Sequence, residues 1–166
     1  MLGSLQDAGN TVTLAGYINL LNESGLLCGL QKFSIDNARR KASIPKLQVY
    51  NNALKMVYNS LSFEQSLLDR KHWGRIFESG IGAYLVSQAF THRFEVYYWR
   101  ERNDEVDFIL RKNNSLIAIE VKSNAEKNTS GLDKFRQHFN PDKAFIVGEG
   151  GITPEEFLSM NIKKLF

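Results

Sequence analysis

Apolar residues repeat along the chain with two spacings, one typical of helices and one typical of strands. Spacings of three and four positions predict helices over Thr13–Asn22, Phe63–Phe90 and Leu132–Phe139, and a further helix begins at Thr153-Pro154. Short apolar or alternating runs predict strands over Leu26–Phe33, Pro45–Tyr50, Phe94–Trp99, Glu105–Arg111, Leu116–Lys122 and Lys143–Val147. Three successive strands, then a helix and another strand, predict an α/β (α+β) architecture with a mixed sheet flanked by helices.

A hairpin is predicted at Asn113-Asn114, because asparagine tolerates the positive φ of a two-residue turn between strands. Counting outward from this turn gives one face that is wholly apolar, with the pairs Val106 with Val121, Phe108 with Ile119 and Leu110 with Ile117. The opposite face pairs Ile109 with Ala118 and Asp107 with Glu120, and it carries Lys122 two residues further along. Two carboxylates are therefore expected side by side.

The juxtaposed Asp107 and Glu120 need an explanation, since like charges directly opposite one another destabilise a sheet. A divalent cation, Mg²⁺ or Mn²⁺, would offset the repulsion, because magnesium takes one or two carboxylates together with water and phosphate oxygens. Lys122 could then stabilise a phosphorane-like transition state or position a water, and Glu78 would add a third carboxylate if its helix packs on this face. The alternative is that both acids simply flank a Lys122 salt bridge at a wet sheet edge, and spacing leaves both explanations open.

Composition excludes several classes of protein. The chain has 166 residues, 43% hydrophobic and 23% charged, which suits one globular domain with a sizeable core. The single Cys28 cannot form an intramolecular disulfide, and no stretch resembles a membrane span or an export signal, so we expect a cytoplasmic protein with no membrane partner. The net charge of +3 favours nucleic-acid binding only slightly. No Gly-x-x-x-x-Gly-Lys is present, so this chain has no ATPase site of the P-loop type.

Four runs together resemble a known family: Arg75-Ile76-Phe77-Glu78, Tyr98-Trp99-Arg100, Glu105-Val106-Asp107-Phe108-Ile109-Leu110 and Ile119-Glu120-Val121-Lys122-Ser123. They resemble the DUF4143 domain, which follows an AAA+ ATPase module in many bacterial and archaeal proteins. That domain is similar to the PD-(D/E)XK nuclease fold, which is restriction-endonuclease-like. The resemblance implies that Glu78, Asp107, Glu120 and Lys122 are catalytic, and that the three carboxylates hold one or two Mg²⁺ or Mn²⁺ ions.

The resemblance also implies an organisation and partners. Residues 1–44 would form a connector, winged-helix-like in its helix and strand over Leu14–Phe33, and residues 45–166 the nuclease-like domain. An N-terminal AAA+ ATPase domain of the parent protein would bind ATP, and DNA would be the substrate. One departure is that Asn51 and Ala53 stand where the family has Asp and Gly.

The sequence therefore leaves two main hypotheses for the function. The first is a metal-dependent DNA nuclease, and the second is an inactive nuclease-fold module that binds DNA or a protein partner for the attached ATPase. A purely oligomer-forming domain is a third possibility. The sequence does not define the oligomeric state.

Overall fold

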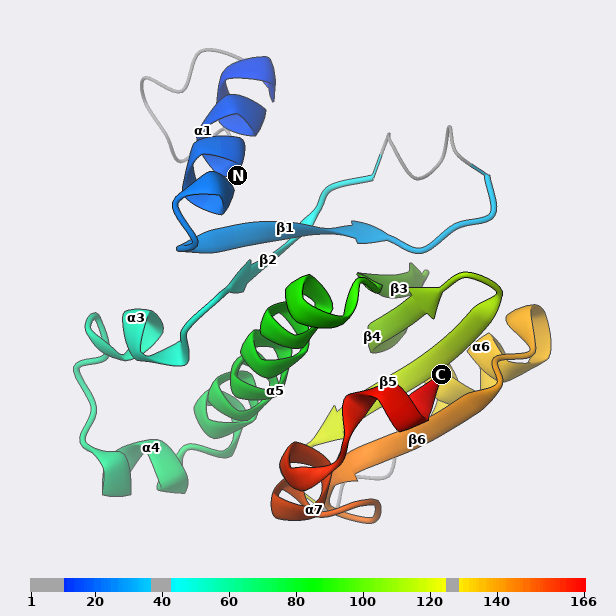
Figure 1. Ribbon diagram of the computed structural model, residues 1–166. Coiled ribbons are helices and arrows are strands. Elements are labelled where there is room, and N and C mark those ends of the chain that lie inside the picture. The colour runs from blue at the N-terminus through cyan, green and yellow to red at the C-terminus, as the bar shows by residue number, and fades with distance from the viewer. Residues whose placement is uncertain (1–10, 37–42, 125–128) are drawn as a thin grey trace.

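A six-stranded mixed sheet organises the protein, as seen in the computed structural model, which describes residues 11–36, 43–124 and 129–166 (Figure 1). The strands are β1 (Leu27–Lys32), β2 (Lys46–Val49), β3 (Glu95–Glu101), β4 (Asp104–Lys112), β5 (Ser115–Lys122) and β6 (Lys143–Gly148). They are ordered β2-β1-β3-β4-β5-β6, with β1–β3 and β5–β6 parallel and the other neighbours antiparallel. The predicted α+β class, with a mixed sheet flanked by helices, is confirmed.

The helices are α1 (Thr11–Glu23), α3 (Asn52–Met56), α4 (Phe63–Leu68), α5 (Arg70–His92), α6 (Ser130–Phe139), α7 (Pro154–Ser159) and the 3₁₀ helix η2 (Ile162–Leu165). The pattern predicted over 63–90 is divided at Asp69, whose carboxylate accepts the His72 N–H and so begins α5. Helix α3 was not predicted. Its N-cap is Asn51, whose side chain accepts the Ala53 N–H, and asparagine caps a helix as well as aspartate does.

The predicted connector contributes a strand to the sheet. Strand β1 pairs with β2 on one side and β3 on the other, and α1 packs against β1. The predicted helix and strand are thus present in this order, while the domain boundary at residue 44 stays a prediction. Residues 1–10 and 37–42 of the connector lie outside the described residues. Within the described part of the chain, no helix has the length and apolar character needed to cross a membrane.

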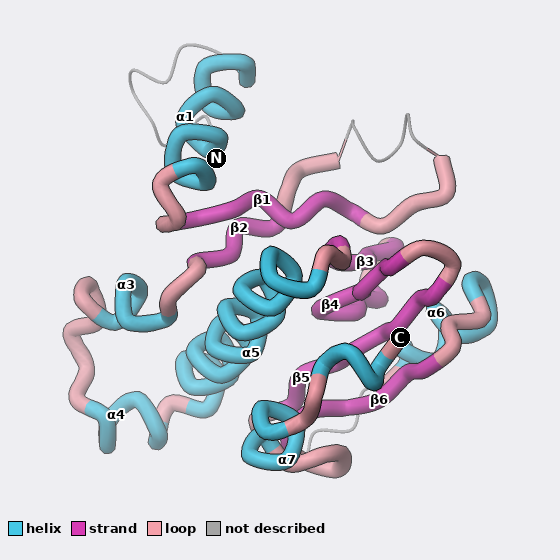
Figure 2. The backbone as a smooth tube through the Cα atoms, viewed as in Figure 1, coloured by secondary structure: helices cyan, strands magenta, loops and turns pink. Residues whose placement is uncertain are grey.

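The two faces of the sheet carry separate cores, covered by α5 and α6 respectively (Figures 1 and 2). On the α5 face, residues such as Leu85, Phe108 and Ile119 are fully buried, and the C-terminal segment closes one side of this core. On the α6 face, Trp99 and Phe135 pack edge to face with ring centroids 5.5 Å apart. Burial on both faces makes the strands between them rigid supports for any side chain at their ends.

The predicted hairpin register is confirmed for Phe108 with Ile119, Ile109 with Ala118 and Leu110 with Ile117. Asn113 has the expected positive φ, 53°. The prediction that Val106 shares the face of Phe108 is wrong, since Val106 packs in the α6-side core and Phe108 in the α5-side core. The reason is a bulge in β4, which interrupts the alternation of side chains between these two residues.

Candidate active site

The bulge in β4 determines where Asp107 points. The register between β3 and β4 shifts by one residue around Tyr98, which faces both Asp107 and Phe108. Bulges of this kind redirect a side chain and are frequent beside active sites. Asp107 and Phe108 consequently meet the same lysine, because Lys46 Nζ lies 3.3 Å from Asp107 Oδ1 and 5.4 Å from the centre of the Phe108 ring. Asp107 is thus on the side of the sheet that α5 covers, and the prediction that it shares the face of Ile109 is wrong. The β4–β5 pairs end at Phe108 and Ile119, so the predicted direct pair of Asp107 with Glu120 is not formed.

Asp107 also terminates the β4–β5 hairpin. Backbone partners extend from the turn as far as Phe108 and Ile119. One step further, the Val121 N–H donates to Asp107 Oδ2 over 2.9 Å. The carboxylate therefore takes a position that a backbone carbonyl occupies in a regular ladder, which fixes Asp107 between the two strands.

Lys46, on β2, joins three acids from two other segments. Its Nζ lies 2.6 Å from Glu78 Oε1 on α5, 3.2 Å from Glu105 Oε1 and 3.3 Å from Asp107 Oδ1, both on β4. Strand β2 is held in place by its own residue Gln48, which is buried and donates to the Ser79 carbonyl of α5 over 3.0 Å. Burial alone would lower the pKa of Lys46, but attraction by Asp107 and Glu78 outweighs it and raises that pKa above the ordinary lysine value. The lysine is accordingly a permanent cation.

Asp107 and Glu120 are the buried acids of the site, with 9% and 7% of their surface exposed. Burial raises the pKa of Asp107 to about 7, and repulsion by Glu78 adds to the effect while Lys46 opposes it. Burial likewise raises the pKa of Glu120, and Lys122 opposes that shift. Both carboxylates are costly to ionise where they lie, so a further cation would stabilise their charged forms.

Glu120 has one satisfied oxygen and one orphan. Its Oε1 accepts from Lys122 Nζ over 2.6 Å. Its Oε2 is buried, and no donor among the described residues lies within hydrogen-bonding distance. An unpartnered buried carboxylate oxygen costs free energy and is an unusual feature of a folded protein. The chemistry of this atom suits a hard cation such as Mg²⁺ or Mn²⁺, which prefers oxygen ligands.

The structure brings the four predicted site residues to one end of the sheet but divides them into two groups. Glu78 and Asp107 are linked through Lys46, and Glu120 is linked to Lys122. Within the described residues, no three His, Cys, Asp or Glu side chains are gathered around one point suited to a metal ion. The catalytic and metal-binding roles of these residues stay predictions, and the geometry favours the pair Asp107 and Glu120 as the part able to accept a cation.

Sequence reasoning missed Lys46 and Glu105. Lys46 precedes Asp107 by 61 positions and reaches it only because β2 packs beside α5. Glu105 was available from the predicted strand, two residues before Asp107 and on the same face if alternation is regular. A signal for Lys46 existed as well, since a lysine that begins an edge strand beside an acidic helix position is a candidate counter-ion.

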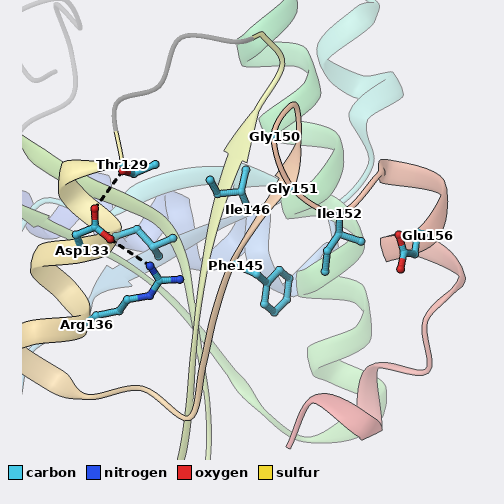
Figure 3. Close-up of a pocket in the computed structure, with 10 residues that line it drawn as sticks. Thr129, Asp133, Arg136, Phe145, Ile146, Gly150, Gly151, Ile152 and Glu156 are labelled. Atoms are coloured by element: carbon cyan, nitrogen blue, oxygen red, sulfur yellow. Dashed lines mark hydrogen bonds and ion pairs between the residues drawn. The ribbon is translucent and has the colours of Figure 1, made fainter.

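A separate cleft lies on the outer edge of β6 and contains none of these residues (Figure 3). Its volume is about 440 Å³, and its walls come from α6, β6, the glycine loop after β6 and α7. Its guanidinium, Arg136, is engaged by Asp133 over 3.1 Å and by the Ala144 carbonyl over 2.7 Å. The guanidinium in this cleft is therefore already paired, whereas the buried acids lie elsewhere in the protein.

Comparison with known proteins gave one match. The model of a family described as a domain of unknown function (DUF4143) matches residues 73–158. This range includes Glu78, Asp107, Glu120 and Lys122, whereas Lys46 lies before it. No curated protein and no solved structure matches the chain.

Proposed function

Because the chain belongs to the DUF4143 family, whose function is unknown, we propose its activity from the site itself: a divalent-cation-dependent phosphodiesterase that acts on DNA. The observation that carries the proposal is the buried Oε2 of Glu120, which has no donor among the described residues. Glu120 is also close enough to Asp107 for its charge to raise the pKa of that aspartate. Two buried acids with raised pKa values favour a cation-binding role over a purely structural one.

Asp107 and Glu120 would hold the cation, one from each strand of the β4–β5 hairpin. Each carboxylate oxygen has two lone pairs, so Asp107 Oδ2 can accept the Val121 N–H and still contact a metal. A bound Mg²⁺ or Mn²⁺ would supply Lewis acidity and activate a water at neutral pH. The strands keep the two acids in a fixed relation, which lowers the cost of arranging the reacting groups.

Lys122 is the residue suited to the phosphate. Its ammonium lies 2.6 Å from Glu120 Oε1, and its side chain is 22% exposed, so it borders both the acids and solvent. A fixed positive charge there would stabilise the negative charge that develops on the phosphoryl oxygens during attack by water. Lys122 thus has the catalytic role, and Asp107 and Glu120 have the metal-binding role.

The similarity of the family to PD-(D/E)XK nucleases supports this assignment of roles. The sheet with one helix carrying a glutamate, one strand carrying an aspartate and the next carrying Glu-x-Lys agrees with that pattern. In the same proposal, an AAA+ ATPase domain of the parent protein is the partner that would bind ATP and deliver the DNA.

A second candidate function is supported by the salt bridges of Lys46. This lysine already neutralises part of the acidic cluster, as a structural ion pair does. In this alternative the domain binds DNA or a protein partner for the ATPase without cleaving anything. It predicts salt-sensitive binding that is unchanged by Glu120→Gln.

Cleavage of labelled duplex DNA in the presence of Mg²⁺ or Mn²⁺ tests the first proposal against the second. We expect the parent protein with its ATPase to cleave DNA, and Lys122→Ala to abolish cleavage while the variant keeps its fold and its Mn²⁺ binding. Lys134→Ala is the matched control, because Lys134 also bridges two acids, Glu101 and Asp104, but lies outside the site. Undiminished cleavage by Lys122→Ala would exclude the proposed role of the lysine.

A further inference from the structure

The geometry points to a one-metal site, in which the ammonium of Lys46 takes the place of a second divalent cation. This inference rests on the proposed function. In it, Glu78 forms an ion pair with Lys46 and does not bind the metal, which is bound by Glu120 and Asp107. It separates two possibilities that the sequence leaves open, since both one and two ions are compatible with three carboxylates and a lysine.

Each N–H donor of the Lys46 ammonium has a carboxylate oxygen within reach. A lysine ammonium has three N–H donors, and three carboxylate oxygens lie within 3.3 Å of Nζ, from Glu78, Glu105 and Asp107. The shortest of these distances, 2.6 Å, is to Glu78 Oε1. Glu78 therefore has a committed cation already, and a metal on the same oxygen would have to displace the lysine.

The lysine is also held from its other sides. Its side chain is 22% exposed and lies over the Phe108 ring, with Nζ 5.4 Å from the centroid. Two residues along β2, buried Gln48 is anchored to the Ser79 carbonyl, directly beside Glu78 in the sequence. The strand and the helix thus meet at adjacent residues, which keeps Nζ on the acids.

Glu120, unlike the acids around Lys46, has a buried oxygen without a partner among the described residues. Glu120 has only Lys122 on Oε1, and its Oε2 is buried with no donor among the residues that the structure describes. Asp107 belongs to both sides, because its Oδ1 meets Lys46 and its Oδ2 meets the backbone of β5. A cation between Asp107 and Glu120 would therefore complete the site without moving Lys46.

Removing the charge of Lys46 should turn the one-metal site into a two-metal site. Without the ammonium, the oxygens of Glu78, Glu105 and Asp107 that now meet Nζ would have no cation between them, and three carboxylates that closed on that position would suit a divalent ion. The Lys46→Met substitution removes the ammonium that lies over the Phe108 ring and leaves an unbranched apolar side chain, one atom shorter, beside that ring. A second metal ion should then bind beside the first.

The stoichiometry of Mn²⁺ binding, counted by titration and electron paramagnetic resonance of the free ion, tests the inference. We expect one Mn²⁺ for the wild-type chain, two for Lys46→Met and one for the control Lys134→Met. In the wild-type background, Glu120→Gln should weaken the single site at least about tenfold, and Glu78→Gln should change it less than about threefold. The glutamate variants keep Lys46, so they give an answer even if Lys46→Met does not fold.

The outcomes separate this inference from the proposed function. Two ions in the wild-type chain, or a Glu78→Gln variant that loses affinity as strongly as Glu120→Gln, would overturn the one-metal site and leave the proposed function standing. A folded Lys46→Met variant that still binds a single ion would overturn it as well. No Mn²⁺ binding by the wild-type chain would overturn the proposed function, and the inference with it.

Discussion

Asp104 and Asp107 lie three positions apart on β4, and each lies beside a lysine. Their environments nevertheless shift their pKa values in opposite directions. Asp104 accepts from Ser130 and Lys134 in a solvent-accessible setting, and these hydrogen bonds hold its pKa below the ordinary value. Asp107 is buried, and burial raises its pKa to about 7 in spite of Lys46. The difference shows that a lysine neighbour alone does not define a structural ion pair. Burial decides whether the acid favours an additional cation.

The largest effect that follows from this contrast concerns the two lysines. Lys46→Met should destabilise the protein by about 3 kcal/mol at pH 8, because it leaves buried Asp107 beside Glu78 with no counter-ion. Lys134→Met should cost much less, since Lys134 and its partners are partly open to solvent and the charges are screened. Urea denaturation of both variants measures the difference, and equal losses would contradict the contrast.

The pH dependence of stability should distinguish the two aspartates. The pKa of Asp107 is 3.8 in the reference state and about 7 in the folded protein, so between these values the folded state retains a proton that the unfolded chain has released. Its contribution to stability is fully present below about pH 4 and is lost as the pH rises to 7, by up to about 1.4 kcal/mol per pH unit.

Asp107→Asn should flatten this slope between pH 5 and 7, whereas Asp104→Asn should not. The lowered pKa of Asp104 affects stability only at lower pH, where its folded form resists protonation. Thermal or urea unfolding across the range measures both slopes. An unchanged slope in Asp107→Asn would mean that Asp107 is not the buried titrating group.

A smaller effect tests how the site is held together. A methyl group at Gly82 of α5 would collide with the Gln48 side chain and the Phe108 ring. Gly82→Ala should therefore cost about 1 kcal/mol, despite the better helix propensity of alanine, and it should loosen the strand that carries Lys46. Gly16→Ala in α1 meets no atom within 4 Å and should be neutral or stabilising. Stability measurements on the pair check this, and a stabilising Gly82→Ala would contradict the tight packing.

Much of the fold could be predicted from local pattern. All six strands and the β4–β5 register follow from apolar periodicity and from the turn at Asn113, because these depend on neighbours in the sequence. Helix α3 could not be predicted, since it has five residues and no apolar repeat long enough to detect. The bulge at Asp107 could not be predicted either, because it arises from the pairing of β4 with β3 on the opposite side from the hairpin.

The candidate site could be predicted only in part. The four residues of the family pattern occupy one end of the sheet, as their spacing suggests. The division of the acids between Lys46 and Lys122 depends on the docking of β2 against α5, a contact between segments far apart in the sequence. The orphan oxygen of Glu120 is also a property of packing and leaves no trace in the pattern of residues.

The central claim is that buried Asp107 and Glu120 form the cation site, and calorimetric titration of Mn²⁺ tests it most directly. The account predicts that the wild-type chain binds Mn²⁺, with or without short duplex DNA, and that Asp107→Asn loses this binding. Asp104→Asn, on the same strand but only partly buried and paired with Lys134, should retain it. Equal Mn²⁺ binding by the two aspartate variants would contradict the account.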